Sequence, residues 1–534
     1  MEIPNPQHWH KSDNKNEIVN EQEMGRETKF SISKQDILIL LSMASLSLMA
    51  ALDGTSISVA LPTISHELGG TAIEAFWTGT SFTLCSAVFQ PVFSSLSNLF
   101  GRKPLVLAAI AWFTIGTIVA GVANNFTHML IGRSLQGIGG GGVITLTAII
   151  IADIVPLSER AKYFGMLSAI WSLGTVVGPV IGGCFAEKIS WRWIFYINFP
   201  FIGIGAILVS WSSHFWVGKE TFATQMRKID FVGIAIFIPS SASFLIPLTW
   251  GGVLYPWYSW HTLAPLIIGS VGLCIFAIYE WRVARHPMIP PAIFHDRTAL
   301  ISFAGYAVVG LLIWCCLYFL PLYYEAVKGF KPIMSGIALF PETFTVAPSG
   351  VIVGLLISRT GQYYWAVCTG WCLSTIGMGL LCLLEVNTGT ITWVFLNLVP
   401  GIGIGMVLPS VALAVQASAT AENLAIAVAA STSFRGFGQS IGVAIGGVIF
   451  QNQMKNNLWH SPALQSVADK YSGDAASMVE IIRGMHGQVK MDLQQAYADS
   501  LRIVWAFCCG ISGLMFIVSL FTQSYDLNRT LITK

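Results

Sequence analysis

Three polar side chains stand inside long apolar stretches of this sequence, in a pattern that could support proton exchange. Asp53 lies in the stretch 36–60, whereas Arg133 and Gln136 lie three residues apart in the stretch 127–152. A charge within a hydrophobic span costs about 2.5–3.5 kcal/mol on insertion scales, so it marks a candidate functional position. Burial disfavours the charged form of a carboxyl group, which suits Asp53 to reversible protonation, with Arg133 tuning that carboxyl or relaying the proton. The alternative is that Arg133 snorkels to the lipid headgroups.

Polar residues interrupt the apolar stretches of the second half as well. Arg435 and Gln439 are four residues apart and share one helical face, which points either to a cavity or to the headgroups. Glu325 and Glu342 are further carboxyl groups near span ends, and Glu342 is expected to meet solvent. The candidates for contact with a substrate in a cavity are Gln136, Gln416, Arg435 and Gln439.

The elements that must carry these residues are membrane-spanning helices. Hydrophobic residues make up 54% of the chain and charged residues 10%, whereas about one quarter of a soluble chain is charged. A span needs about 20 apolar residues, and the sequence predicts an all-α membrane protein with 14 transmembrane helices. They are expected at 36–60, 73–95, 105–124, 127–152, 161–186, 193–213, 230–250, 262–281, 299–324, 334–357, 364–384, 391–417, 424–451 and 501–522.

The segments between and beyond the spans set the orientation. Lysine and arginine gather in the tails 1–35 and 523–534 and in the loops on the same side, which predicts that both termini are cytosolic. The polar tail 1–35 is predicted to be disordered. The loop 452–500 is predicted to be extracellular, and its part 477–500 to form an amphipathic helix that runs into the last span. Asn125 begins a weak glycosylation sequon on the outer side.

One motif lies in the short inside loop after the second span. The segment 94–104 reads Ser-Ser-Leu-Ser-Asn-Leu-Phe-Gly-Arg-Lys-Pro. Asp153, at the inner end of the fourth span, is a candidate ion-pair partner for Arg102. The alternative is that Arg102 and Lys103 serve only as positive-inside signals.

A second motif lies in the fifth span. Gly174, Gly178 and Gly182 fall at i, i+4 and i+8, so they form a groove on one helical face that lets another helix approach closely. Pro179 removes a backbone hydrogen bond and permits a kink.

These motifs resemble those of the major facilitator superfamily. In the loop motif, Gly101, Arg102 and Lys103 match the family pattern, whereas Ser94 and Asn98 replace its Gly and its Asp. The segment 174–183 is similar to the family's antiporter motif, and 52–64 is similar to the first-span motif of the fourteen-span drug:proton antiporters, of the fungal toxin and multidrug efflux type. The resemblance implies a role in conformational gating for Asn98, Gly101, Arg102, Lys103, Asp153, Gly174, Gly178, Pro179 and Gly182.

The resemblance also implies an architecture and a function. Two six-helix bundles, 36–213 and 299–522, would be joined by a linker, 214–298, that carries two extra transmembrane helices. Substrate would bind between the bundles near the midplane of the membrane. The expected function is proton-coupled efflux, by antiport at the plasma membrane, of small hydrophobic organic molecules such as drugs or a secondary metabolite. The alternative is a vacuolar or plasma-membrane transporter of a polar solute, such as a basic amino acid or a siderophore.

Other classes of protein find little support in the residues. The chain has neither a His-Glu-x-x-His motif nor a phosphate-binding Gly-x-x-x-x-Gly-Lys-Ser/Thr motif, so neither an enzyme nor an ATP-driven pump is expected. Its cysteines fall almost entirely within apolar stretches, so no metal site is expected. No cofactor is expected beyond the proton gradient. The expected partners are a small hydrophobic substrate, protons and the lipid bilayer, without nucleic acid, and the chain is expected to be a monomer.

Overall fold

The computed structural model describes residues 33–70, 72–155, 157–212, 222–251, 255–420, 423–460 and 478–525, and the regular elements within them are helices. Most of the tail predicted at 1–35, and the last residues of the tail 523–534, lie outside the described residues. The first half of the chain forms α2 (Lys34–Leu68), α3 (Ala72–Phe100), α4 (Arg102–Gly121), α5 (Phe126–Ile154), α6 (Leu157–Lys188), α7 (Trp193–Tyr196) and α8 (Asn198–Trp211).

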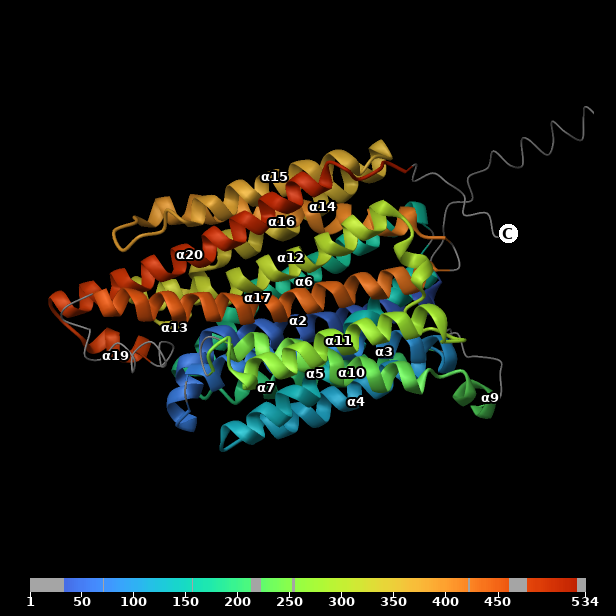
Figure 1. Ribbon diagram of the computed structural model, residues 1–534, viewed down its shortest axis with the longest axis horizontal. Helices are drawn as coiled ribbons and strands as arrows, with labels where there is room; N and C mark the ends of the chain where they lie inside the picture. Colours follow the sequence, from blue (N-terminus) through green and yellow to red (C-terminus); the bar gives the residue numbers. More distant parts are fainter. Residues whose placement is uncertain are drawn as a thin grey trace, which may run out of the picture.

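The middle of the chain forms α9 (Phe222–Arg227), α10 (Phe231–Trp250), α11 (Trp260–Arg282) and the 3-10 turn η1 (Pro291–Phe294). The second half forms α12 (Arg297–Leu322), the π-helical turn η2 (Tyr323–Val327), α13 (Pro332–Ala338), α14 (Phe340–Thr360), α15 (Tyr364–Leu381), α16 (Thr390–Ser418), α17 (Leu424–His460), α19 (Met478–Gly484) and α20 (Gln488–Ser519). The long helices run side by side along one axis (Figure 1). We call the end where α2 begins and α20 ends the terminal end, and the end that carries α19 the distal end.

Local sequence signals fix where several of these helices begin and end. Ser33 caps α2 in a capping box with Asp36, and Gly69 ends that helix with a left-handed backbone (φ 63°). Asn125, the residue of the predicted sequon, caps α5, since its Oδ1 accepts a hydrogen bond from the backbone N–H of His128 at 2.8 Å. Glycosylation at Asn125 stays a prediction.

The predicted spans correspond to long helices along the whole described chain. By length and apolar composition, 12 of the described helical segments qualify as membrane spans. α3 and α17 occupy the positions of the remaining two predicted spans. They do not qualify by apolar composition, because they carry many polar side chains. These two helices pack against each other in the middle of the molecule, where polar residues are shielded from lipid. The count of 14 spans therefore stays a prediction, whereas the all-helical membrane fold is confirmed.

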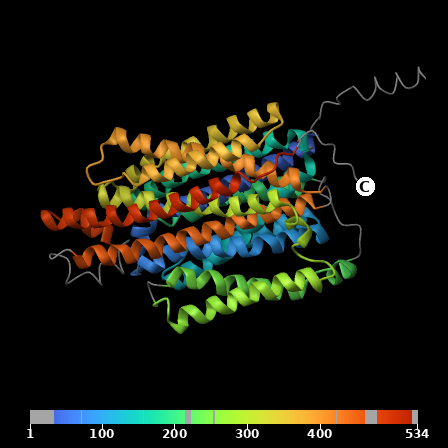
Figure 2. The same cartoon turned by 45° about the horizontal axis from the view of Figure 1, so that its top comes forward.

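The two halves of the chain meet along a few helices. α3 and α5 pack against α17, and α6 packs against α13 and α14. α10 and α11 pack on each other and lie along one side of the molecule, where α10 touches α3 and α17 (Figure 2). This arrangement matches the order of helices expected for two bundles and a linker, but the boundaries 36–213, 214–298 and 299–522 stay predictions.

The loop predicted at 452–500 is wrong in its extent. α17 continues to His460, and α20 begins at Gln488, so each helix projects beyond its expected span. The amphipathic helix predicted at 477–500 is divided: α19 is a separate short helix, and the chain turns at Gly487, whose φ of 84° favours glycine. The part 461–477 lies outside the described residues. The apolar periodicity predicted burial correctly for Val479, Ile482, Leu493 and Tyr497, but Val489 is 41% exposed, because the chain turns just before it at Gly487.

Candidate functional site

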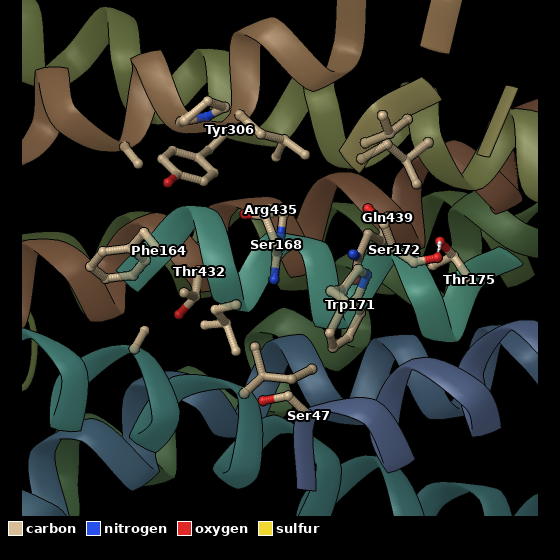
Figure 3. Close-up of a pocket in the computed structure, with 18 of the residues that line it drawn as sticks. Ser47, Phe164, Ser168, Trp171, Ser172, Thr175, Tyr306, Thr432, Arg435 and Gln439 are labelled. Atoms are coloured by element: carbon tan, nitrogen blue, oxygen red, sulfur yellow. Dashed lines mark hydrogen bonds between the residues drawn. The ribbon is translucent and has the colours of Figure 1, made fainter. Parts of the chain in front are cut away.

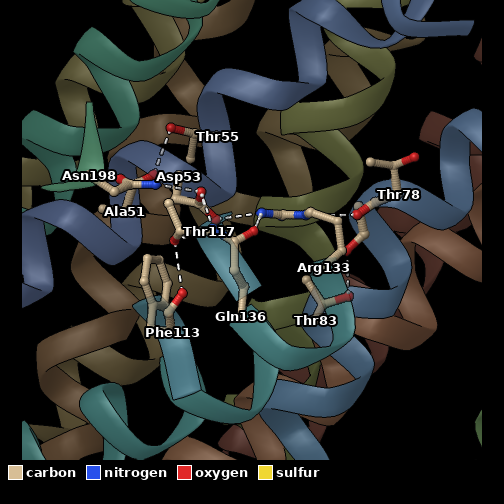
Figure 4. Close-up of polar contacts among 11 residues, drawn as sticks. Ala51, Asp53, Thr55, Thr78, Thr83, Phe113, Thr117, Arg133, Gln136 and Asn198 are labelled. Carbon is tan, nitrogen blue, oxygen red and sulfur yellow. Dashed lines mark hydrogen bonds and ion pairs between the residues drawn. The ribbon is translucent and has the colours of Figure 1, made fainter. Parts of the chain in front are cut away.

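A buried ion pair joins the first and fourth predicted spans. Arg133 on α5 donates from Nη1 to Oδ2 of Asp53 on α2 at 2.5 Å, and both side chains are shielded from solvent. Arg133 also donates from Nε to the backbone carbonyl of Thr78 on α3 at 3.0 Å. The snorkelling alternative for Arg133 is thereby excluded in this structure, because the guanidinium lies among three helices and not at a headgroup (Figure 4).

Amide side chains complete this buried polar network. Gln136 accepts from Arg133 Nη1 at 2.9 Å and donates from Nε2 to Asp53 Oδ1 at 3.1 Å and to Thr117 Oγ1 at 2.9 Å. Asn198 on α8 donates to the same Asp53 oxygen at 2.8 Å. Arg133 Nη2 and Asn198 Oδ1 have no hydrogen-bond partner among the described residues. The carboxylate therefore accepts three hydrogen bonds, and within the described part of the chain the network has an amino group and an amide oxygen free for a further partner.

Sequence reasoning missed Asn198 and Thr117 in this network. Asn198 lies in an aromatic-rich stretch at the start of the predicted span 193–213, and a single threonine in an apolar span carries no distinctive signal. A buried amide one residue before Phe-Pro in a span is the one feature that could have pointed to Asn198. Glycine explains how Thr117 reaches Gln136: a Cβ on Gly116 would run into the backbone of Gln136, so α4 and α5 approach closely at this level.

At the terminal end, Arg102 makes the predicted ion pair. Its Nε donates to Asp153 Oδ2 at 2.9 Å, and its Nη1 donates to the Ser97 carbonyl at 2.7 Å and to Asn98 Oδ1 at 2.8 Å. Asn98 thus accepts a hydrogen bond from Arg102, the arginine with which an aspartate at this position would form an ion pair. The φ of Gly101 is 90°, a left-handed value that explains a glycine between α3 and α4. The gating role of these residues stays a prediction.

Lys103 has a structural role beyond a positive-inside signal. Its Nζ donates to the carbonyls of Ser210 and Ser212 at 2.8 and 2.9 Å. These carbonyls lie at the end of α8, where they have no partner within the helix. Lys103 therefore joins the start of α4 to the end of α8.

The glycine face of α6 packs on α2, next to Asp53. A Cβ added to Gly174 would crowd Ala51, one on Gly178 would crowd Thr55, and one on Gly182 would run into the backbone of Ser56. The sequence predicted the groove but not its partner helix. Pro179 lies on the neighbouring face, and a Cβ on Gly336 of α13 would lie 2.8 Å from its carbonyl carbon. α6 thus contacts both halves of the chain through small residues, as expected for a helix at a moving interface.

A cavity lies between the two halves, beside the ion-pair network. It encloses about 1140 Å³ of empty space, open solvent at its mouth included. α6 contributes one wall with Phe164, Ser168, Trp171, Ser172 and Thr175, and α12, α14, α16 and α17 supply the opposite wall (Figure 3). Trp314 of α12 lines the cavity and would lie 3.9 Å from a Cβ on Gly54, the neighbour of Asp53. Trp314 therefore links the cavity to α2 at the level of Asp53.

The cavity includes two of the four predicted substrate contacts. Arg435 and Gln439 line it, so their shared face points to a cavity and not to headgroups. Gln136 belongs instead to the Asp53 network, and Gln416 is buried on α16 outside the lining. Glu342, expected to meet solvent, is only 4% exposed and lines the cavity, because α13 and α14 bend the chain inward after η2.

Contacts between the halves close the space at both ends of the cavity. At the distal end, Gly183 of α6 lies against the backbone of Pro332 on α13. At the terminal end, Ala148 and Ala152 of α5 form an apolar cluster with Leu424 and Val428 of α17. Thr145 and Thr432 are hydrogen-bonded across the same interface at 3.3 Å. These contacts join the two halves on either side of the cavity along the helix axis.

A second buried carboxylate, Glu325, lies at the distal end within η2. Arg483 of α19 donates from Nη2 to Glu325 Oε2 at 2.9 Å and to the Phe330 carbonyl at 2.8 Å. A small cavity lined by Ser58, Tyr318, Glu325 and Val479 lies beneath α19. α19 therefore covers the distal side of α2 and α12.

Long apolar helices, a buried ion pair that links them and a central cavity that both halves line define a membrane transporter. The chain belongs to the major facilitator superfamily, since its residues 43–443 match the model of that family. Members of this family are transporters rather than enzymes.

Related sequences are similar along almost the whole chain. An MFS transporter named L2, from a Phoma species, is 49% identical over 95% of this chain and 85% of its own length. The MFS-type efflux pump LUC4 of a Fusarium species is 35% identical over 93% of this chain and 89% of its own. An MFS-type transporter of the acurin A biosynthesis cluster in Aspergillus aculeatus is 33% identical over 93% and 91%.

Solved structures share the fold at low sequence identity. A bacterial homologue of the human lysosomal transporter Spinster, in an inward-facing and unoccupied conformation, superposes with a TM-score of 0.62 at 16% identity. The superposition covers 92% of this chain and 98% of that one. The fold expected from the sequence motifs is thereby confirmed.

Proposed function

We propose that this protein is a proton-coupled antiporter that exports small hydrophobic organic molecules, such as drugs or a secondary metabolite. The observation that carries this proposal is the buried Asp53–Arg133 network on α2 and α5, two helices that also contribute residues to the cavity between the halves. The names of the relatives support the direction of transport, because LUC4 is called an efflux pump and another relative belongs to a biosynthesis cluster. The apolar lining supports a hydrophobic substrate over the alternative of a polar solute.

In the proposed cycle, Asp53 takes up a proton from the outside and releases it inside. The proton neutralises the carboxylate, which weakens its hold on Arg133 and changes the packing of α2 against α5. Because Trp314 lines the cavity and lies beside Gly54 of α2, a shift of α2 at this level would be felt by a bound substrate. Substrate and proton then compete through this contact, which is the requirement for antiport.

The gating residues form the moving contacts in this proposal. The Arg102–Asp153 pair and the apolar cluster of α5 and α17 hold the terminal end closed, and the α6–α13 contact holds the distal end closed. Alternating access requires that these two sets of contacts open in turn. The protein is proposed to act as a monomer in the plasma membrane with both termini in the cytosol.

Efflux from proteoliposomes tests the proposed function. Purified protein is reconstituted with Nile red, rhodamine 6G or pyrenebutyrate, which are neutral, cationic and anionic probes. An imposed pH gradient is expected to drive movement of at least one dye against the direction of proton flow, and nigericin, which collapses the gradient, is expected to abolish it. Dye movement that is equal with and without the gradient would contradict proton coupling.

A further inference from the structure

The central cavity contains a cation that has no ion-pair partner among the described residues. Arg435 of α17 lines the cavity, and among the described residues no hydrogen bond or ion pair to its guanidinium is present. Its one aromatic contact is with Trp171 of α6, where the guanidinium carbon lies 5.6 Å from the ring centroid. Figure 3 shows Arg435 among Ser168, Trp171 and Thr432 within the cavity.

The other arginine in the interior shows how this chain neutralises a buried cation. Arg133 is paired with a carboxylate, hydrogen-bonded to an amide and a backbone carbonyl, and stacked on Phe82 at 4.5 Å. Among the described residues, Arg435 has the ring contact with Trp171 and an electrostatic interaction with Tyr306 of α12, but no carboxylate partner. Because a guanidinium stays charged in proteins, Arg435 presents a permanent positive charge to any molecule that enters the cavity.

Glu342 lines the same cavity but does not remove the need for an anion. Among the described residues no hydrogen bond or ion pair to its carboxyl group is present, so the two charges are not joined. A buried carboxyl can lose its charge by taking a proton, whereas a guanidinium cannot lose its charge in the same way. When Glu342 is protonated, the cavity therefore still carries the positive charge of Arg435.

We propose that Arg435 is the anchor for an acidic group on the exported substrate, so that the substrate class is an amphipathic organic anion with an apolar or aromatic body. This inference rests on the proposed export function and adds the chemical class of the substrate. The acidic group pairs with the guanidinium from the face opposite Trp171. Gln439, one turn further along α17, and Ser168 of α6 line the same cavity and carry groups that can donate to the same acid. The apolar body lies along Phe164, Leu408 and Trp314.

Three probes with one aromatic body and different charges test this inference. Pyrenebutyrate carries a carboxylate, pyrenebutanol a neutral hydroxyl and pyrenebutylamine an ammonium group. Binding to the purified wild-type chain is measured by energy transfer from tryptophan to pyrene. The expected order is pyrenebutyrate first, with at least about tenfold tighter binding than pyrenebutanol, the effect of one charge-assisted hydrogen bond.

Variants assign the preference to one side chain. Arg435→Gln is expected to remove the preference for the carboxylate while it leaves pyrenebutanol binding unchanged, which shows that the cavity is still folded. Arg435→Lys is expected to restore part of the preference, because an ammonium group keeps the charge but not the planar fork. Glu342→Gln is expected to keep or increase the preference. Arg285→Gln, which removes an exposed arginine of the linker, is the matched control.

The outcomes separate this inference from the proposed function. Equal binding of the three probes, no binding of any, or a carboxylate preference that survives in Arg435→Gln would overturn the inference. A preference for the amine that disappears in Glu342→Gln would also overturn it and would make Glu342 the anchor. A carboxylate preference that depends on Arg435, with no effect of a pH gradient on dye movement, would uphold the inference and contradict proton coupling.

Discussion

Removing either partner of the Asp53–Arg133 pair is expected to lower the stability of the fold, but by different amounts. Asp53→Asn leaves the guanidinium of Arg133 buried without a counter-charge. Arg133→Gln leaves a carboxyl group that still accepts hydrogen bonds from Gln136 and Asn198. The carboxyl group can become neutral by taking a proton, but the guanidinium cannot. We therefore expect Asp53→Asn to destabilise the protein more than Arg133→Gln.

The magnitudes follow from the geometry of the pair. A buried charge left without its partner costs about 3–5 kcal/mol, which is the expectation for Asp53→Asn. Loss of hydrogen bonds to a charged group costs about 1.5–3 kcal/mol, which is the expectation for Arg133→Gln. The double variant replaces both charges with amides, so it is expected to cost less than the sum of the two single variants.

Thermal unfolding in detergent, followed by tryptophan fluorescence, measures this order. The unfolding temperature is expected to be lowest for Asp53→Asn, and the double variant is expected to unfold at a higher temperature than Asp53→Asn. The reasoning is refuted if Arg133→Gln is the least stable variant, or if Asp53→Asn unfolds at the wild-type temperature.

Three further predictions concern contacts around the site. Gly182→Ala is expected to lower stability by about 1–3 kcal/mol, because its Cβ meets the backbone of α2. The control is Gly203→Ala, whose Cβ would lie in open space. It is expected to be neutral or slightly stabilising in the same unfolding assay. Lys103→Gln is expected to cost about 1 kcal/mol through the uncapped end of α8, and an unchanged unfolding temperature would speak against that role. Arg483→Gln is expected to release α19 from Glu325 and to increase trypsin cleavage after Lys490, a site that both proteins keep. The unfolding temperature of the helical core is expected to change little. Equal cleavage after Lys490 in variant and wild type would show that the ion pair does not hold α19.

The helices could be predicted well from the sequence, because each membrane span requires about 20 consecutive, mostly apolar residues. A charge inside a span is so unfavourable that Asp53 and Arg133 stood out at once, and the structure places them in contact. The pair Arg102–Asp153 was also predicted, since charges at helix ends on the same side of the membrane have few other partners.

Other features of the site depend on which helices face each other, which one sequence does not reveal. Gln136 was assigned to the substrate cavity, but it turns to Asp53 because α4 packs closely at Gly116. Glu342 was placed in solvent because it follows a proline near a span end, yet α13 carries the chain inward and buries it. The cavity walls formed by serine, threonine and tryptophan on α6 carry no signal that separates them from ordinary packing residues.

The most direct test of proton coupling is dye efflux from proteoliposomes with wild-type protein and Asp53→Asn side by side. The dye is one that wild-type protein exports under a pH gradient, and dye exchange at equal pH on both sides reports whether the variant still binds and moves substrate. The account predicts that Asp53→Asn keeps exchange and loses all response to the gradient. Full gradient-driven efflux by Asp53→Asn would contradict the account and would move the coupling site away from α2.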